Sequence, residues 1–120
     1  MTNAIHNASS SQLPHHNLIA YQVALLFLRA VLDAGVKDSK LRDEATRAAK
    51  GTCLNIAEGA ARMSRADKAR AYTIARGELI EAVAAVEIAA SCGDTTQAHA
   101  DACVALGRRV YALLTRLIRP

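Results

Sequence analysis

The residues with the most unusual types and spacing lie between positions 47 and 62. Glycine inside a helix costs up to about 1 kcal/mol relative to alanine, so two glycines on one helix face indicate that another backbone comes close. A nearby amide can hydrogen bond to that backbone, and Glu58 and Arg62 have the i,i+4 spacing of an ion pair. The residues sharing this face, the motif face, are Arg47, Gly51, Asn55, Glu58, Gly59 and Arg62.

Two interpretations of the motif face are open. It could be a structural polar network at a contact between two helices or two subunits. It could instead be a ligand or nucleic-acid site in which Arg47 and Arg62 bind the anion and Glu58 orients them.

Positive charge is concentrated in two stretches, one from position 62 to 76 and one from 108 to 119. The net charge is +4, which permits an anionic partner without requiring one. With only three tyrosines, one phenylalanine and no tryptophan, recognition by base stacking is not expected. The candidate nucleic-acid-binding residues are Arg62, Arg65, Lys68, Arg70, Arg76, Arg108, Arg109 and Arg116.

Patterns that carry catalysis or metal binding are missing from the sequence. There is no HExxH, no GxxxxGK[ST] and no GxSxG. A di-iron bundle needs histidines that follow a glutamate by three positions, and none does so here. The four histidines are His6, His15, His16 and His99. We therefore expect no catalytic residue, no metal and no cofactor, and a binding module in place of an enzyme.

Composition predicts an all-helical protein. The apolar fraction is 52% but aromatics are only 3%, so the core must be mostly alanine and leucine, which favour helices over strands. The 120 residues suit a single domain. The three cysteines have no metal-binding spacing, and we expect them to be buried as small apolar side chains. The sequence shows neither a signal peptide nor an apolar stretch of about 20 residues, and we expect a cytoplasmic protein.

Four helices are expected to position these residues. The first should run from Pro14 to about Gly35, and the second from about Lys40, capped by Ser39, to Met63. The third should begin at the capping box 64–67 and stop at Gly93, and the fourth should begin near Asp94 or Thr95. Because the links are short, neighbouring helices must be antiparallel. The predicted fold is an all-α, antiparallel up-down-up-down four-helix bundle over residues 14–120, preceded by a disordered polar tail at 1–13.

The first helix has apolar residues on more than one side. Leu18, Leu25 and Leu32 recur every seven residues, which is typical of a bundle seam. Leu26 and Phe27 widen the apolar surface beyond that stripe. We expect the extra side to meet another subunit.

The second and third helices resemble the four-helix-bundle proteins encoded in intervening sequences of bacterial 23S rRNA genes. The hallmark of that family is RAA, then NIAEG, then an arginine, then IA-x-GS-L-x-E. The matching residues are 47–49, 55–59, Arg62, 74–75, Gly77, Leu79 and Glu81. The chain departs from the pattern at Glu44, at 51–52 and at Glu78, where the family has glutamine, a serine-isoleucine-like pair and serine. We expect the contact between these two helices to be adjusted accordingly.

The resemblance implies a ring-shaped homo-oligomer, typically a pentamer. It also implies kinship with the accessory proteins of diversity-generating retroelements, which bind nucleic acid and a reverse transcriptase. Two functions follow as hypotheses. The first is an oligomer that binds RNA or DNA through its basic patches, since a ring repeats each patch and adds avidity. The second is a protein-interaction scaffold or accessory subunit in which the arginines only keep the chain soluble.

Overall fold

The computed structural model describes residues 12–120, and this part of the chain forms four α-helices and no strand. Residues 1–11, which include His6 and most of the predicted tail, lie outside the described residues. The prediction of an all-helical four-helix fold is confirmed. The helices are α2 (Ile19–Asp33), α3 (Ser39–Ala61), α4 (Arg65–Ser91) and α5 (Gln97–Ile118).

Polar side chains cap three of these helices. The side chains of Asp38, Ser64 and Thr96 accept hydrogen bonds from backbone N–H groups in the first turns of α3, α4 and α5. Gly93, just beyond α4, has a φ of 81°, a left-handed conformation that glycine adopts without strain. The predicted helix start at Ser64 and the stop at Gly93 are therefore confirmed, with the Ser64 side chain supplying the cap.

Three helix starts differ from the sequence-based predictions. α2 begins at Ile19, five residues after Pro14, because residues 14–17 form turns and Leu18 is extended, with a ψ of 118°. α3 is capped by Asp38 and not by Ser39. α5 begins at Gln97, because the Thr95 hydroxyl instead donates to the carbonyl of Ala34, at 2.6 Å.

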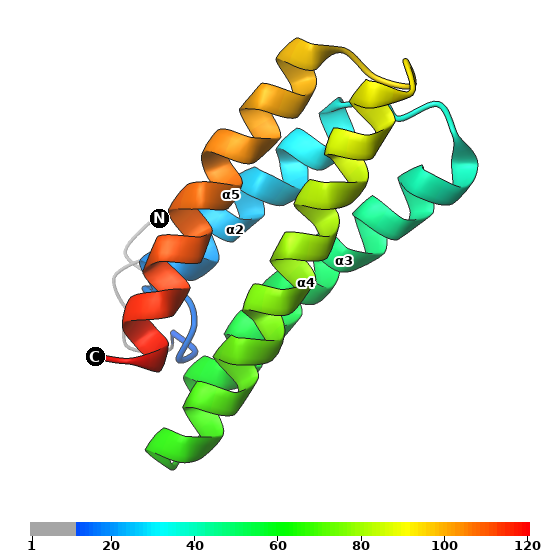
Figure 1. Cartoon of the computed structure of the whole chain (residues 1–120). Coiled ribbons are helices and arrows are strands. Elements are labelled where there is room, and N and C mark those ends of the chain that lie inside the picture. Colours follow the sequence, from blue (N-terminus) through cyan, green and yellow to red (C-terminus); the bar gives the residue numbers. More distant parts are fainter. Residues whose placement is uncertain (1–11) are drawn as a thin grey trace, which may run out of the picture.

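Each helix packs against its neighbours in sequence, and α5 also packs against α2. Successive helices run in opposite directions (Figure 1). α2 and α4 therefore occupy diagonally opposite corners of the bundle. The contact between α3 and α4 is the most extensive, and their hairpin reaches past the start of α2 (Figure 1).

The loops at the opposite end of the bundle are joined to each other. The Lys37 backbone N–H donates to the Asp94 carbonyl at 2.9 Å, next to the Thr95–Ala34 hydrogen bond. Ala34, Val36 and Ala89 form a small apolar cluster beneath this junction. The connections 34–38 and 92–96 thus hold one end of the bundle together.

The core uses a different side of α2 from the predicted seam. The buried residues of α2 are Ala20, Val23, Ala24, Phe27 and Val31. By contrast, Leu25 and Leu32 are 42% and 50% exposed. The seam prediction was wrong for Leu25 and Leu32, because α2 is apolar on two faces and the face with Phe27 is the one that packs inward, whereas Leu18 does pack against the core. None of the helices in residues 12–120 combines the length and the apolar character needed to cross a membrane.

Candidate nucleic-acid interface and the motif face

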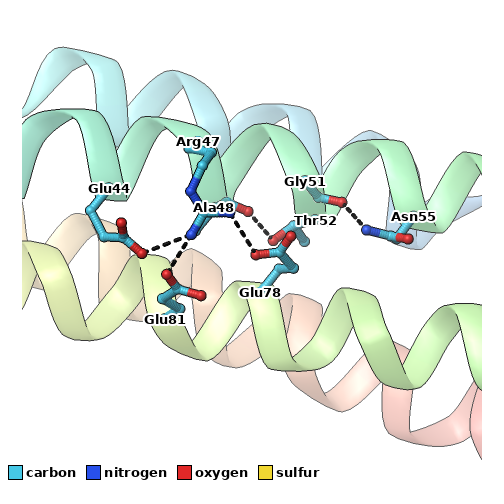
Figure 2. A network of polar contacts seen from close by, with 8 residues as sticks. All are labelled: Glu44, Arg47, Ala48, Gly51, Thr52, Asn55, Glu78 and Glu81. Atoms are coloured by element: carbon cyan, nitrogen blue, oxygen red, sulfur yellow. Dashed lines mark hydrogen bonds and ion pairs between the residues drawn. The ribbon is translucent and has the colours of Figure 1, made fainter.

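The motif face of α3 lies against α4, and Arg47 joins the two helices (Figure 2). The Arg47 guanidinium contacts Glu44 of its own helix at 2.7 Å. It also pairs with two carboxylates of α4, Glu81 and, at 3.6 Å, Glu78. The hydrogen bond that Arg47 donates to Glu44, followed by the negative charge of Glu44, raises the pKa of Arg47 above its ordinary value. Three carboxylates around one guanidinium leave an excess of negative charge, so this arginine is poorly placed to bind a phosphate.

Gly51 makes room for one of these carboxylates. A Cβ atom at position 51 would lie 2.5 Å from Oε2 of Glu78. Thr52, which is fully buried, satisfies its hydroxyl by donating to the carbonyl of Ala48 at 2.8 Å. The four residues where the chain departs from the family pattern, Glu44, Gly51, Thr52 and Glu78, thus lie in one small region, as Figure 2 shows. These departures are related at the helix contact. Glu78 is longer than the serine of the family pattern, and its carboxylate occupies the space next to Gly51 that a side chain there would fill.

Gly59 makes room for an aromatic ring of α4. A Cβ atom there would lie 2.6 Å from Cε1 of Tyr72, whose side chain is buried between α3 and α4. Burial also raises the pKa of the Tyr72 hydroxyl. The expectation that the glycine stripe is closely covered is confirmed, with α4 of the same chain as the covering element. Asn55 differs from expectation, since its amide donates to the Gly51 carbonyl in its own helix at 2.8 Å.

Most basic side chains in the stretch 62–76 have partners within the chain. Arg62 pairs with Glu58 at 3.3 Å, as its spacing predicts, and Arg70 pairs with Asp67 at 3.5 Å. Two others bond across helices. The Lys68 ammonium donates to the last carbonyls of α3, reaching Ala60 O at 2.9 Å.

Arg76 completes this set of internally partnered cations. Its guanidinium donates to the Thr115 hydroxyl at 3.1 Å and lies 5.2 Å from the centre of the Tyr111 ring, a cation–π distance. Arg65 is exposed, and no carboxylate of residues 12–120 lies within ion-pair distance of it. The structure therefore gives four of the five cations of this stretch a partner within the chain, and two of those partners are carboxylates.

The arginines of α5 are different. They lie on the exposed side of the helix, and no carboxylate of the described chain lies within ion-pair distance of any of them. Arg109 and Arg116 are seven residues apart, so they share one helix face at a separation of about 10 Å. Arg119, just beyond the helix, is also exposed. The set comprises Arg108, Arg109, Arg116 and Arg119.

Two features escaped the sequence analysis. Ile74 and Ile88 of α4 are 50% and 51% exposed, and Ile80, on another face of the same helix, is 53% exposed. Ile74 and Ile88 are two heptads apart, so they share one face of α4, and this spacing is visible in the sequence. The other feature is an apolar groove between α4 and α5, which depends on the packing of two helices and leaves no local pattern.

The cysteines are only partly as expected. Cys53 and Cys103 are buried, but Cys92 is exposed at the end of α4. Burial raises the pKa of both buried thiols to about 11. Within residues 12–120, no cluster of histidine, cysteine and acidic side chains is arranged to hold a metal ion.

A family comparison agrees with this geometry. A search among curated proteins finds no match. The model of the 23S rRNA-intervening sequence protein family matches residues 16–116, which includes most of all four helices and the whole motif face. The chain therefore belongs to the 23S rRNA-intervening sequence protein family.

Proposed function

We propose that this protein is a cytoplasmic, non-enzymatic homo-oligomer that binds nucleic acid through the outer face of α5. The observation that carries the proposal is the row of arginines on α5, which have no carboxylate partner within residues 12–120. Guanidinium groups bind phosphate oxygens well, often through two parallel hydrogen bonds. In an oligomer this row would be repeated in every subunit, which raises avidity.

Self-association is supported by exposed apolar side chains on α2 and α4. Large apolar patches on a surface usually mark interaction sites. Here half-exposed leucines and isoleucines gather on two helices: Leu25, Leu26, Leu32, Ile74, Ile80 and Ile88. Light scattering should therefore give a mass several times the 12.8 kDa of one chain. A monomer at micromolar concentration would contradict the proposed self-association.

A salt-titrated filter-binding assay tests the nucleic-acid part, with a structured RNA and a DNA duplex as probes. We expect retention below about 100 mM salt and its loss at a few hundred millimolar, because phosphate contacts release counterions. No retention of either probe at low salt would contradict the proposal.

A matched pair of variants locates the site. Arg109→Glu with Arg116→Glu should weaken binding at least tenfold. Arg62→Glu with Arg70→Glu changes the net charge by the same amount but removes cations that already have partners, so its effect should be clearly smaller. Equal losses in the two variants would mean that overall charge, and not the α5 row, governs binding.

The α3–α4 hairpin favours a scaffold as the second candidate. Leu54 and Met63 are its most exposed large apolar side chains, at 71% and 95%. Exposed apolar groups outside the α2 and α4 faces suit a protein partner. Replacing both with serine should then abolish capture of that partner while nucleic-acid retention and oligomer mass stay unchanged.

A further inference from the structure

An apolar groove of about 300 Å³ lies between α4 and α5. Val83 of α4 approaches α5 closely at Gly107, where an added Cβ would lie 2.7 Å from its Cγ2 atom. Ile80 and Tyr111, at 53% and 41% exposed, line the groove with these two residues. Two charged residues, Glu87 and Arg108, complete the lining. The groove can thus accept an apolar helix face that carries a positive charge beside Glu87.

The outer face of α2 has that composition. Ile19, Leu25, Leu26 and Leu32 are each 42% to 55% exposed and project from one side of the helix. The cation among them is Arg29, which is exposed and has no carboxylate of residues 12–120 within ion-pair distance. Arg29 follows Leu25 by four positions and precedes Leu32 by three, so it lies in the middle of the apolar row.

These two surfaces cannot meet within one chain. α2 packs against α3 and α5 but lies diagonally opposite α4. Its outer face therefore cannot reach the α4–α5 groove of the same chain. Each surface can be covered by the other only when two copies come together.

We propose that the outer face of α2 in one copy packs into the α4–α5 groove of the next copy, with Arg29 facing Glu87. The occupant is a second copy because this chain itself presents an exposed apolar row with a charge opposite to that of Glu87. This inference rests on the homo-oligomer proposed above and names the surfaces that form it.

The contact joins two unlike surfaces, with a consequence for assembly. Every added copy leaves one α2 face and one groove uncovered until the last copy meets the first, so the assembly closes as a ring or grows as a filament. Arg109 and Arg116 lie about 100° around α5 from Arg108 and the groove, since successive helical residues are turned by that angle. Both lie outside the groove lining, and Arg116 borders Ile19 of α2 in a separate pocket.

Cysteine cross-linking tests the contact directly. Two variants are made in a Cys92→Ser background, one with Arg29→Cys and one with Glu87→Cys. Cys53 and Cys103 are buried and stay unreactive. Under mild oxidation, a mixture of the two variants should give a covalent dimer of twice the 12.8 kDa chain mass. Each variant alone should give at least fivefold less.

A charge exchange supplies the second measurement. Arg29→Glu and Glu87→Arg should each shift the protein towards smaller species in light scattering. The variant carrying both changes should recover the mass of the unmodified protein, because the two charges are again opposite. Circular dichroism should show unchanged helicity throughout, since both residues are exposed.

Three results would overturn the inference. Efficient cross-linking of the Arg29→Cys variant alone would mean that α2 meets α2. An oligomer without cross-linking in the mixture would mean that the groove takes another occupant, such as the N-terminal segment or a different protein. A monomeric unmodified protein would remove the proposed oligomer itself, and scattering separates this result from the other two.

Discussion

Similar residue types have different roles in the α3–α4 contact and on the outer faces of α2 and α5. Arg47 lies among three carboxylates of its own chain, whereas Arg109 has no carboxylate of residues 12–120 within ion-pair distance. Phe27 is fully buried, whereas Leu25, two residues earlier on the same helix, is 42% exposed. Residue type alone therefore does not say whether a side chain stabilises the fold or stays free for a partner. The outcome depends on whether a neighbouring helix supplies a complementary residue.

The largest difference in the free energy of unfolding is expected between substitutions on the two faces of α2. Phe27→Ala should lower the free energy of unfolding by about 3–5 kcal/mol, because it removes a fully buried ring from the core. Leu25→Ala should cost the isolated chain no more than about 0.5 kcal/mol. Urea unfolding followed by circular dichroism at several protein concentrations measures both. Similar costs at every concentration would mean that the exposed face of α2 is also core, and the comparison would fail.

Two helical glycines sharpen the contrast at the α3–α4 contact. Gly59→Ala should destabilise the chain by about 1–3 kcal/mol, because the new methyl group overlaps the Tyr72 ring. Gly77→Ala should stabilise it by about 0.5–1 kcal/mol, because nothing lies within 4 Å of the new atom and alanine favours helix. The same urea experiment reports both. A stabilising Gly59→Ala would show that the two helices are not held close together there.

A smaller effect is expected from Arg47. Arg47→Gln should lower the melting temperature, because it leaves three neighbouring carboxylates without their shared cation. The loss should shrink as salt is added, since these groups are partly exposed. Arg62→Gln breaks a single exposed pair and should have less effect. A drop that does not depend on salt would argue that Arg47 acts through packing.

The smallest effect on stability is expected at Cys92. Cys92→Ser should leave the free energy of unfolding within about 0.5 kcal/mol of the unmodified protein. In the native protein a thiol reagent should modify Cys92 rapidly. It should spare Cys53 and Cys103 even near pH 9, because burial raises their pKa to about 11 and keeps them protonated. Modification of all three at one rate would show that the bundle opens readily.

Local signals in the sequence predicted the fold well. Ser64 and Gly93 mark helix ends through bonds and conformations that involve only nearby residues, and both predictions hold. The glycine stripe also predicted a close helix contact, because a glycine is costly in a helix unless something packs on it. The exact start of α2 was missed, since turns at 14–17 compete with a helical first turn.

Contacts between helices could not be predicted from the sequence of one helix at a time. Both faces of α2 are apolar, so the spacing of Leu18, Leu25 and Leu32 was a valid pattern, yet only Leu18 packs against the core while Leu25 and Leu32 are exposed. The partner of Arg47 in α4, Glu81, is 34 residues away, and its identity follows only from how α3 and α4 are aligned. For the same reason the arginines could be located in the sequence, but Arg70, which has a carboxylate partner, could not be distinguished from Arg109, which has none within residues 12–120.

The joined loops at one end of the bundle have a dynamic consequence. The connections 34–38 and 92–96 hold each other through Lys37 and Thr95, whereas the opposite turn at 62–64 projects beyond α2 and is exposed. Fluctuations that separate helices should therefore start at the projecting turn and stop before the joined loops. Amide hydrogens near Arg62 and Met63 should exchange with deuterium early, and those of Lys37 and Asp94 late. Proteases should cut first where exchange is fastest.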